Sequence, residues 1–220
     1  MTDSLEKLTG RLERGLLFVL SGPSGAGKGT VLAQFISRHP FIGCSVSTTT
    51  RAARDGERDG VHYNFVSVDK FDQLVADGQF LEWARVHGNR YGTTREQIEA
   101  ALAEGRIMFL EIDIQGGMSV KEQIPEAVLV FVLPSVPEQW VDRLRKRGSE
   151  TEESLRLRVK AALEEIRIGD KKYDYLVRND ELQDAVDELE GIVRGEMCRF
   201  ARTSGEAVNR YEEFLRCKEV

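Results

Sequence analysis

The chain has 220 residues, of which 41% are hydrophobic and 31% charged, which suits one α/β core but is short for two full domains. A formal net charge of −6 disfavours a general nucleic-acid binder, and no apolar run approaches the ~20 residues of a membrane-spanning helix. Three cysteines without CxxC spacing indicate neither a disulfide framework nor a zinc site, so we expect a soluble protein of the reducing cytoplasm.

Short apolar runs alternate with segments of helical periodicity along most of the chain. We expect strands at residues 16–20, 42–46, 107–112, 128–133 and 173–177, and helices at 31–37, 94–103, 137–147, 152–168 and 180–200. This alternation predicts an α/β fold with a parallel core sheet that helices cover on both faces. In such a sheet, ligands bind beyond the carboxyl ends of the strands.

The first apolar run leads into SGPSGAGKGT, residues 21–30. Strand, glycine-rich loop, lysine and helix follow in the order of a phosphate-binding loop (P-loop), in which backbone N–H groups and the lysine bind phosphate oxygens. We therefore expect this loop to bind ATP through Gly22, Pro23, Ser24, Gly25, Ala26, Gly27, Lys28, Gly29 and Thr30.

The residue after the loop lysine is unusual. The common motif has Ser or Thr there, whose hydroxyl contacts magnesium, but this chain has Gly29 and places Thr30 one residue later. We expect Thr30, the oxygens of the nucleotide or water to complete the shell of a Mg²⁺ ion that arrives with ATP.

A segment rich in charge and turn-forming residues interrupts the alternation after the second strand. It contains RAARDGERDGVHYNF and then VDKFDQLVADG, which predicts a short helix that stops at Gly78. We interpret residues 48–91, approximately, as a lobe inserted between core segments 15–47 and 92–200. Arg51 and Arg54 in this lobe suit a phosphate dianion, because guanidinium groups bind phosphate bidentately.

The strand predicted at 107–112 ends in acidic residues. Glu111 and Asp113 alternate with Ile112, so we expect both carboxylates on one side of the strand, where a P-loop enzyme places an acid near magnesium. Glu111 is the candidate metal ligand, directly or through water.

A basic run and a tail complete the chain. Arg143 and Arg147 are one helical turn apart and face the same way, and the break at Gly148 suits a small mobile lid at about 143–158. Residues 201–220 form a C-terminal extension, which we expect to include an amphipathic helix and to which we assign no role.

Five stretches together resemble the guanylate kinase family of P-loop nucleoside monophosphate kinases. They are GPSGAGKGT, SVSTTTRAARDGERDGVHYNFVS, FLEWARVHGNRYGTT, LEIDIQGG and RGSETEES, and the similarity runs from about residue 16 to 187. The resemblance implies one domain, 1–220, built as a three-layer sandwich with an inserted GMP-binding lobe and a small lid. It also implies a reaction in which MgATP phosphorylates GMP.

The resemblance assigns roles to individual residues. It implies that Arg51, Arg54, Tyr63 and Tyr91 hold the GMP phosphate and that Ser47, Glu82, Thr93 and Asp113 read the guanine. It implies catalytic roles for Lys28 and for the lid arginines Arg143, Arg147 and Arg158, which close over the ATP phosphates. Asn179 matches a position that contacts adenine.

The chemistry of guanine agrees with this assignment. Guanine presents N1–H and a 2-amino group on one edge, and a carboxylate such as Glu82 can accept from both. Adenine offers no such pair, and a site built for polar groups rejects analogues that lack them. Ser47 and Thr93 have hydroxyls that can donate to the guanine O6.

Three functions remain open at this stage. The leading one is transfer of phosphate from MgATP to GMP or dGMP, giving ADP and the diphosphate. The alternatives are a P-loop kinase of another small phosphorylated acceptor, and a non-catalytic guanylate-kinase-like domain that binds peptides. The intact loop with Lys28 disfavours the last. The sequence does not indicate the oligomeric state.

Overall fold

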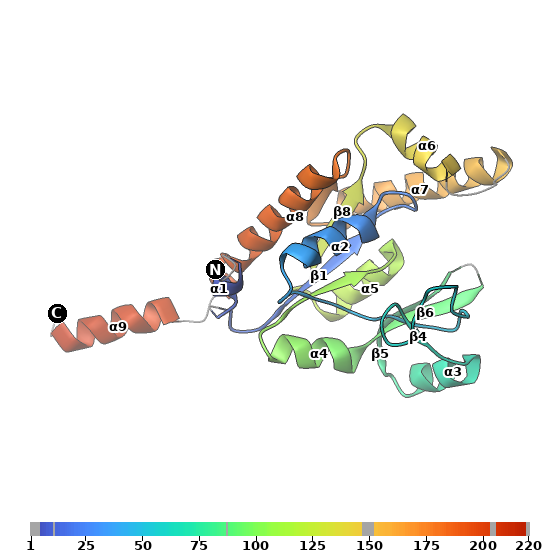
Figure 1. The fold of residues 1–220 in the computed structure, drawn as a ribbon. Coiled ribbons are helices and arrows are strands. Elements are labelled where there is room, and N and C mark those ends of the chain that lie inside the picture. Colours follow the sequence, from blue (N-terminus) through green and yellow to red (C-terminus); the bar gives the residue numbers. More distant parts are fainter. Residues whose placement is uncertain (1–4, 11, 87, 147–151, 203–205, 219–220) are drawn as a thin grey trace.

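The core of the protein is a five-stranded parallel sheet (Figure 1), seen in a computed structural model that describes residues 5–10, 12–86, 88–146, 152–202 and 206–218. The strand order is β2-β7-β1-β8-β9, and every neighbouring pair runs parallel. The strands are β1 (Leu16–Ser21), β2 (Gly43–Cys44), β7 (Ile107–Glu111), β8 (Val128–Leu133) and β9 (Tyr175–Arg178).

Helices cover both faces of this sheet, as the alternation predicted. Alternate residues of β1 point to opposite faces. Phe18 and Leu20 pack with α2 (Lys28–Arg38) and α8 (Leu182–Met197), whereas Leu17 and Val19 pack with α4 (Arg95–Ala103) and α5 (Ile114–Gln123). Because each face is buried under helices, all six residues of β1 are buried. The expected α/β fold with a parallel core sheet is confirmed.

Several predicted ends differ from the observed ones. The strand predicted at 42–46 is only Gly43–Cys44, because β7 pairs with just these two residues. The strand predicted at 173–177 begins at Tyr175. Before it, the Tyr173 ring packs 5.4 Å from Phe131, and the Asp174 carboxylate accepts from the Leu129 N–H at 2.8 Å. The helix predicted at 152–168 extends to Lys172.

A second, four-stranded sheet forms the segment between β2 and α4. Its order is β4-β3-β6-β5, with β3 parallel to β4 and the other pairs antiparallel. The strands are β3 (Thr48–Thr49), β4 (Asn64–Phe65), β5 (Phe80–Val86) and β6 (Asn89–Thr94). α3 (Val68–Ala76) lies on this sheet and ends before Gly78, which has the positive φ (65°) that favours glycine.

Two helices stand above the carboxyl ends of the core strands (Figure 1): α6 (Pro137–Lys146) and α7 (Glu152–Lys172). They pack through Trp140, Leu144, Leu155 and Ala162. The tail contains a short 3₁₀ turn, Phe200–Arg202, and α9 (Glu206–Lys218), which extends away from the body of the protein. No helix in the described ranges is long and apolar enough to cross a membrane.

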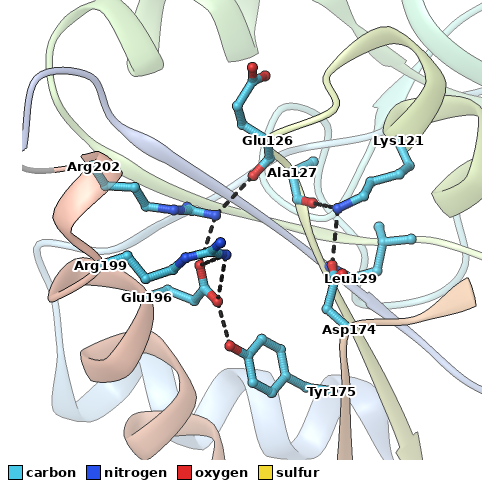
Figure 2. A network of polar contacts seen from close by, with 9 residues as sticks. All are labelled: Lys121, Glu126, Ala127, Leu129, Asp174, Tyr175, Glu196, Arg199 and Arg202. Carbon is cyan, nitrogen blue, oxygen red and sulfur yellow. Dashed lines mark hydrogen bonds and ion pairs between the residues drawn. The ribbon is translucent and has the colours of Figure 1, made fainter.

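A polar network lies at the amino-terminal ends of β8 and β9 (Figure 2). Glu196, 1% exposed near the end of α8, accepts from the Tyr175 hydroxyl and pairs with Arg202 at 2.7 Å and Arg199 at 3.3 Å. Arg202 also donates to the Glu126 carbonyl at 3.2 Å. These bonds fasten the segment after α8, up to Arg202, to the sheet, and α1 (Glu6–Thr9) is held beside the core through its neighbour Leu5, which is buried in the core cluster.

Candidate active site

The loop after β1 has the backbone shape that a phosphate-binding loop needs. Gly22 and Gly27 both have positive φ, 150° and 88°. A Cβ at residue 22 would lie 2.2 Å from the Val132 carbonyl oxygen, and one at residue 27 would lie 2.2 Å from Nδ2 of Asn179. Only glycine fits at these two positions. Helix α2 begins directly after the loop, with Gly27 as its N-cap.

Lys28, the first residue of α2, curls back over this loop. Its Nζ donates to the Gly22 carbonyl at 2.6 Å and contacts the Pro23 carbonyl at 3.5 Å. The ammonium group thus lies beside the loop backbone, and it can exchange these carbonyls for phosphate oxygens.

Gly29 has a packing reason that the sequence did not reveal. A Cβ there would lie 3.1 Å from a carboxylate oxygen of Glu111, at the end of β7. A Ser or Thr side chain there would require that carboxylate to shift by a few tenths of an ångström. Thr30 follows in the first turn of α2 and lines the same cavity as Glu111.

One cavity of about 710 Å³ brings the loop and the inserted lobe together. Fifteen predicted site residues line it: Gly22, Ser24, Gly25, Gly27, Lys28, Gly29, Thr30, Ser47, Arg51, Arg54, Tyr63, Glu82, Tyr91, Glu111 and Asp113. A second cavity, about 780 Å³, lies at the polar network of Figure 2, at the other end of the sheet. The second cavity is slightly larger, but of the two only the first is lined by Lys28, so we take the first as the candidate active site.

The remaining predicted residues that the structure describes do not line the cavity. Pro23 and Ala26 belong to the loop, and Thr93 is fully buried below Glu82. Arg147 lies outside the described residues.

The two lid arginines that are described contact protein atoms near the loop. Arg143 donates to the carbonyls of Asn179 at 3.0 Å and Asp180 at 3.4 Å, and Arg158 donates to Oγ of Ser24 at 3.1 Å. Trp140 of α6 adds a bond from Nε1 to the Ser24 carbonyl at 2.9 Å. Both lid helices are thus attached to the P-loop.

Two of the phosphate-clamp candidates, Arg51 and Arg54, donate hydrogen bonds to Glu57, which the sequence analysis missed. Arg51 donates through both terminal nitrogens to the Glu57 carboxylate at 2.9 and 2.8 Å, and the Arg54 backbone N–H donates to it at 2.8 Å. The Arg51 bonds are the main reason that the Glu57 pKa falls to about 2. The guanidinium also lies 5.3 Å from the centre of the Tyr63 ring. The sequence signal that could have indicated this contact is the position of Glu57, three residues after Arg54.

Glu82 is a buried carboxylate with few compensating bonds. It is 6% exposed, and one oxygen accepts from the Thr93 hydroxyl at 2.7 Å. Burial raises its pKa to about 7; the Thr93 bond opposes the shift, and the nearby charge of Asp113 adds to it. The Thr93 hydroxyl donates its hydrogen bond to Glu82 and does not line the cavity. In this structure it therefore supports the Glu82 carboxylate.

Asp113 does not continue β7, contrary to the expectation that it shares a strand face with Glu111. The strand ends at Glu111, and Asp113 is the N-cap of α5, where its carboxylate accepts from the Gly116 N–H at 2.8 Å. Asp113 caps the helix and does not extend the strand, because its carboxylate satisfies a backbone N–H that has no partner within the first turn of α5. Both carboxylates nevertheless line the cavity.

Asn179 has a structural partner that bears on its predicted contact with adenine. The side chain is 6% exposed, and Nδ2 donates to the Ala26 carbonyl at 2.7 Å. This bond joins the end of β9 to the P-loop, so the amide supports the loop.

Glu165 of α7 also lines the cavity, although sequence reasoning did not single it out. Burial raises its pKa, while the charge of Lys28 opposes and that of Asp113 adds to the shift. A glutamate on a long, otherwise charged helix has no distinguishing local signal, so only the fold reveals its position.

The residues beside the loop fit a magnesium ion that a nucleotide brings with it. Glu111 supplies carboxylate oxygens and Thr30 a hydroxyl, which are ligand types that Mg²⁺ accepts while it keeps waters and phosphate oxygens. Within the described ranges, no group of three or more His, Cys, Asp or Glu residues forms a separate metal cluster.

Known proteins resemble this chain over most of its length. Residues 14–196 match the family model described as guanylate kinase. A guanylate kinase of Clostridium perfringens is 49% identical over 189 residues, 86% of this chain and 87% of that protein. One of Carboxydothermus hydrogenoformans is 46% identical over 193 residues, 88% and 94% of the two chains. The crystal structure of guanylate kinase from Anaplasma phagocytophilum has a TM-score of 0.74 at 31% identity and covers 94% of this chain and 96% of its own.

Proposed function

The chain belongs to the guanylate kinase family, and we propose on that premise that its GMP and ATP sites share the cavity of about 710 Å³ beside Lys28. The protein is an ATP:GMP phosphotransferase: it transfers the γ-phosphate of ATP to GMP and releases ADP and GDP. The proposal extends this reaction to dGMP, because no predicted acceptor contact is to the ribose 2′-hydroxyl.

One observation carries the proposal: a single cavity is lined by the phosphate-binding loop on one side and by Arg51 and Glu82 on the other. A kinase must bring donor and acceptor phosphates together, and an acceptor selected by its base needs a reader at the far end. Loop, arginine clamp and buried carboxylate provide these three parts. Nothing in the fold or the relatives favours another phosphorylated acceptor or a peptide.

The proposed chemistry is positioning and charge neutralisation. Phosphoryl transfer passes through a loose transition state whose charge is spread over the phosphate oxygens, so the protein has little covalent work to do. Lys28 and the loop N–H groups hold the donor phosphates, while Arg51, Arg54, Tyr63 and Tyr91 hold the acceptor phosphate. Ser47, Glu82 and Asp113 bind the guanine, and Thr93 acts through Glu82.

Magnesium bound with ATP would be held by Glu111 and Thr30, directly or through water, and it supplies positive charge to the phosphate oxygens. The chemistry of these two side chains supports this, since carboxylate and hydroxyl oxygens are ligands that Mg²⁺ accepts beside phosphate oxygens and water.

In this proposal the lid arginines reach the ATP phosphates when the lid closes, and closure keeps water from accepting the γ-phosphate. The contacts of Arg158 and Trp140 with Ser24 support a lid that is already attached to the loop. We assign Arg143 and Arg147 to the same closure, and Asn179 to the adenine end of the ATP site. The cytoplasm is the proposed location, and the free thiols of Cys44 and Cys198 suit it.

A coupled assay of ADP release tests the proposal across GMP, dGMP, AMP, UMP and ribose phosphates. We expect strong activity with GMP, clear activity with dGMP and little with the others. Activity with AMP or a ribose phosphate and none with GMP would overturn it. Saturable peptide binding without ADP release would point to the non-catalytic alternative.

A further inference from the structure

Strand β5 has one residue more than its partner β6 at Leu81. Phe80 pairs with Thr94 and Glu82 pairs with Thr93, so two steps along β5 match one step along β6. This is a β-bulge, an irregularity that bends a strand and re-aims the side chains around it. Bulges are common beside active sites, and this one immediately precedes the buried carboxylate.

The bulge decides which way Glu82 points. In a regular strand, residues 80 and 82 would share one face. Here the Phe80 ring stacks on Phe71 at 4.5 Å, and Trp83 contacts the same Phe71 ring at 6.2 Å. Phe80 and Trp83 therefore lie together on the α3 side of the sheet, whereas Glu82 and Ala84 line the cavity. Without the extra residue, Glu82 would lie on the face of Phe80.

Gln123, the last residue of α5, binds the bulge from outside. Its Nε2 donates to the carbonyl oxygen of Leu81, and its Oε1 accepts from Arg95 at 2.5 Å. A bulge disrupts the ladder locally, so a side-chain donor at this carbonyl holds the irregular backbone in one geometry. The side chain of Gln123 is exposed and does not line the cavity, so it cannot touch a nucleotide there.

The same helix also meets the other end of Glu82. A Cβ on Gly116, in the first turn of α5, would lie 2.9 Å from Oε2 of Glu82. The carboxylate therefore rests against the beginning of α5 while Gln123, at its end, holds the backbone carbonyl that precedes residue 82. The helix thus holds Glu82 at both ends.

We propose that Gln123 is a positioning residue for guanine selection: by fixing the bulge at Leu81 it aims the Glu82 carboxylate at the base. The inference rests on the proposed function, in which Glu82 reads guanine. It predicts that a change on the surface of α5 alters acceptor selectivity while the ATP site stays intact.

Gln123→Glu is the decisive variant, because it keeps the shape and the acceptor for Arg95 but cannot donate to Leu81. The assay should determine KM for GMP, KM for ATP and the preference for GMP over IMP, which lacks the 2-amino group. We expect KM for GMP to rise about ten-fold and the preference for GMP over IMP to fall by a similar factor. A ten-fold change corresponds to the loss of one hydrogen bond between guanine and the charged Glu82 carboxylate. KM for ATP stays within two-fold. Gln123→Lys, which restores a donor, should recover most of the selectivity.

Two further variants separate the possible failures. Val193→Ala, on the buried face of α8, lowers stability without touching the lobe and should leave the GMP preference unchanged. Glu82→Gln should lose the preference. If it does and Gln123→Glu does not, or if Lys fails to rescue, the inference on Gln123 is overturned. If Glu82→Gln stays fully selective, the proposed role of Glu82 fails and the inference falls with it.

Discussion

Replacing Glu82 with Gln should stabilise the fold at neutral pH while it weakens guanine selection. Burial raises the pKa of this carboxyl from 4.5 to about 7 in the folded chain. At 1.36 kcal/mol for each pH unit between the two values, holding it ionised in the folded state costs about 3 kcal/mol. Gln has the same shape and keeps an oxygen that can accept from Thr93, so it removes the charge with little other change.

The sign follows from the two protonation states. Below pH 4.5 the carboxyl is protonated in both the folded and the unfolded chain and contributes nothing. Between pH 4.5 and 7 the folded chain keeps a proton that the unfolded chain has lost, so the free energy of unfolding falls as pH rises. Above pH 7 the loss is complete. The stability of Glu82→Gln relative to the natural chain should therefore rise by about 3 kcal/mol from pH 4 to pH 8.

Urea unfolding at pH values from 4 to 8 measures this difference, since the other titrating groups are common to both proteins. Glu122→Gln, at an exposed position on α5, is the matched control for replacing a glutamate with glutamine. A constant difference between Glu82→Gln and the natural chain from pH 4 to pH 8 would refute the reasoning. The same carboxylate must be ionised to accept from guanine, so KM for GMP should rise about ten-fold from pH 8 to pH 6, and the variant should lack this dependence.

Three other substitutions test separate parts of the site. Lys28→Ala should lower turnover at least about 100-fold and leave GMP affinity nearly intact; single-turnover kinetics and GMP calorimetry would check this, and full-speed turnover would contradict the loop's role. Glu57→Gln should raise KM for GMP several-fold with KM for ATP unchanged, because Arg51 loses its charged partner; an equal rise in both would point to general loosening. Gly27→Ala should lower the melting temperature and ATP affinity, since its Cβ would strike the Asn179 amide; a variant with normal ATP binding would show that the loop can shift.

The P-loop was predictable because its signals are local. The apolar run of β1, the glycines, Lys28 and the helix follow one another within about 20 residues, and each has a preference for its own conformation. The alternation of strands and helices also gave the parallel core sheet correctly, since its strands are apolar on both faces.

One departure is local, within the first turn of α5, and the others come from contacts between distant segments. Asp113 looked like the continuation of a strand, but capping of α5 outweighed strand propensity. Asn179 binds Ala26 across 153 residues, and Gln123 binds Leu81 across 42. No local pattern announces a β-bulge in FLEWARV either, because the extra residue exists only relative to the register of the partner strand. Such features depend on tertiary packing, which a linear pattern does not encode.

The strand order has a consequence for synthesis of the protein. β1 is made first among the core strands, yet it lies in the middle of the sheet, and residue 16 pairs with residue 107, 91 residues later. At about 5–20 residues per second, the ribosome needs roughly 5–20 s to produce that partner, and β8 comes later still. For that time the apolar run LLFVL has neither of its neighbours. The bond between the loop and Asn179 forms only after residue 179 has been made, so we expect nucleotide binding to follow the synthesis of β9.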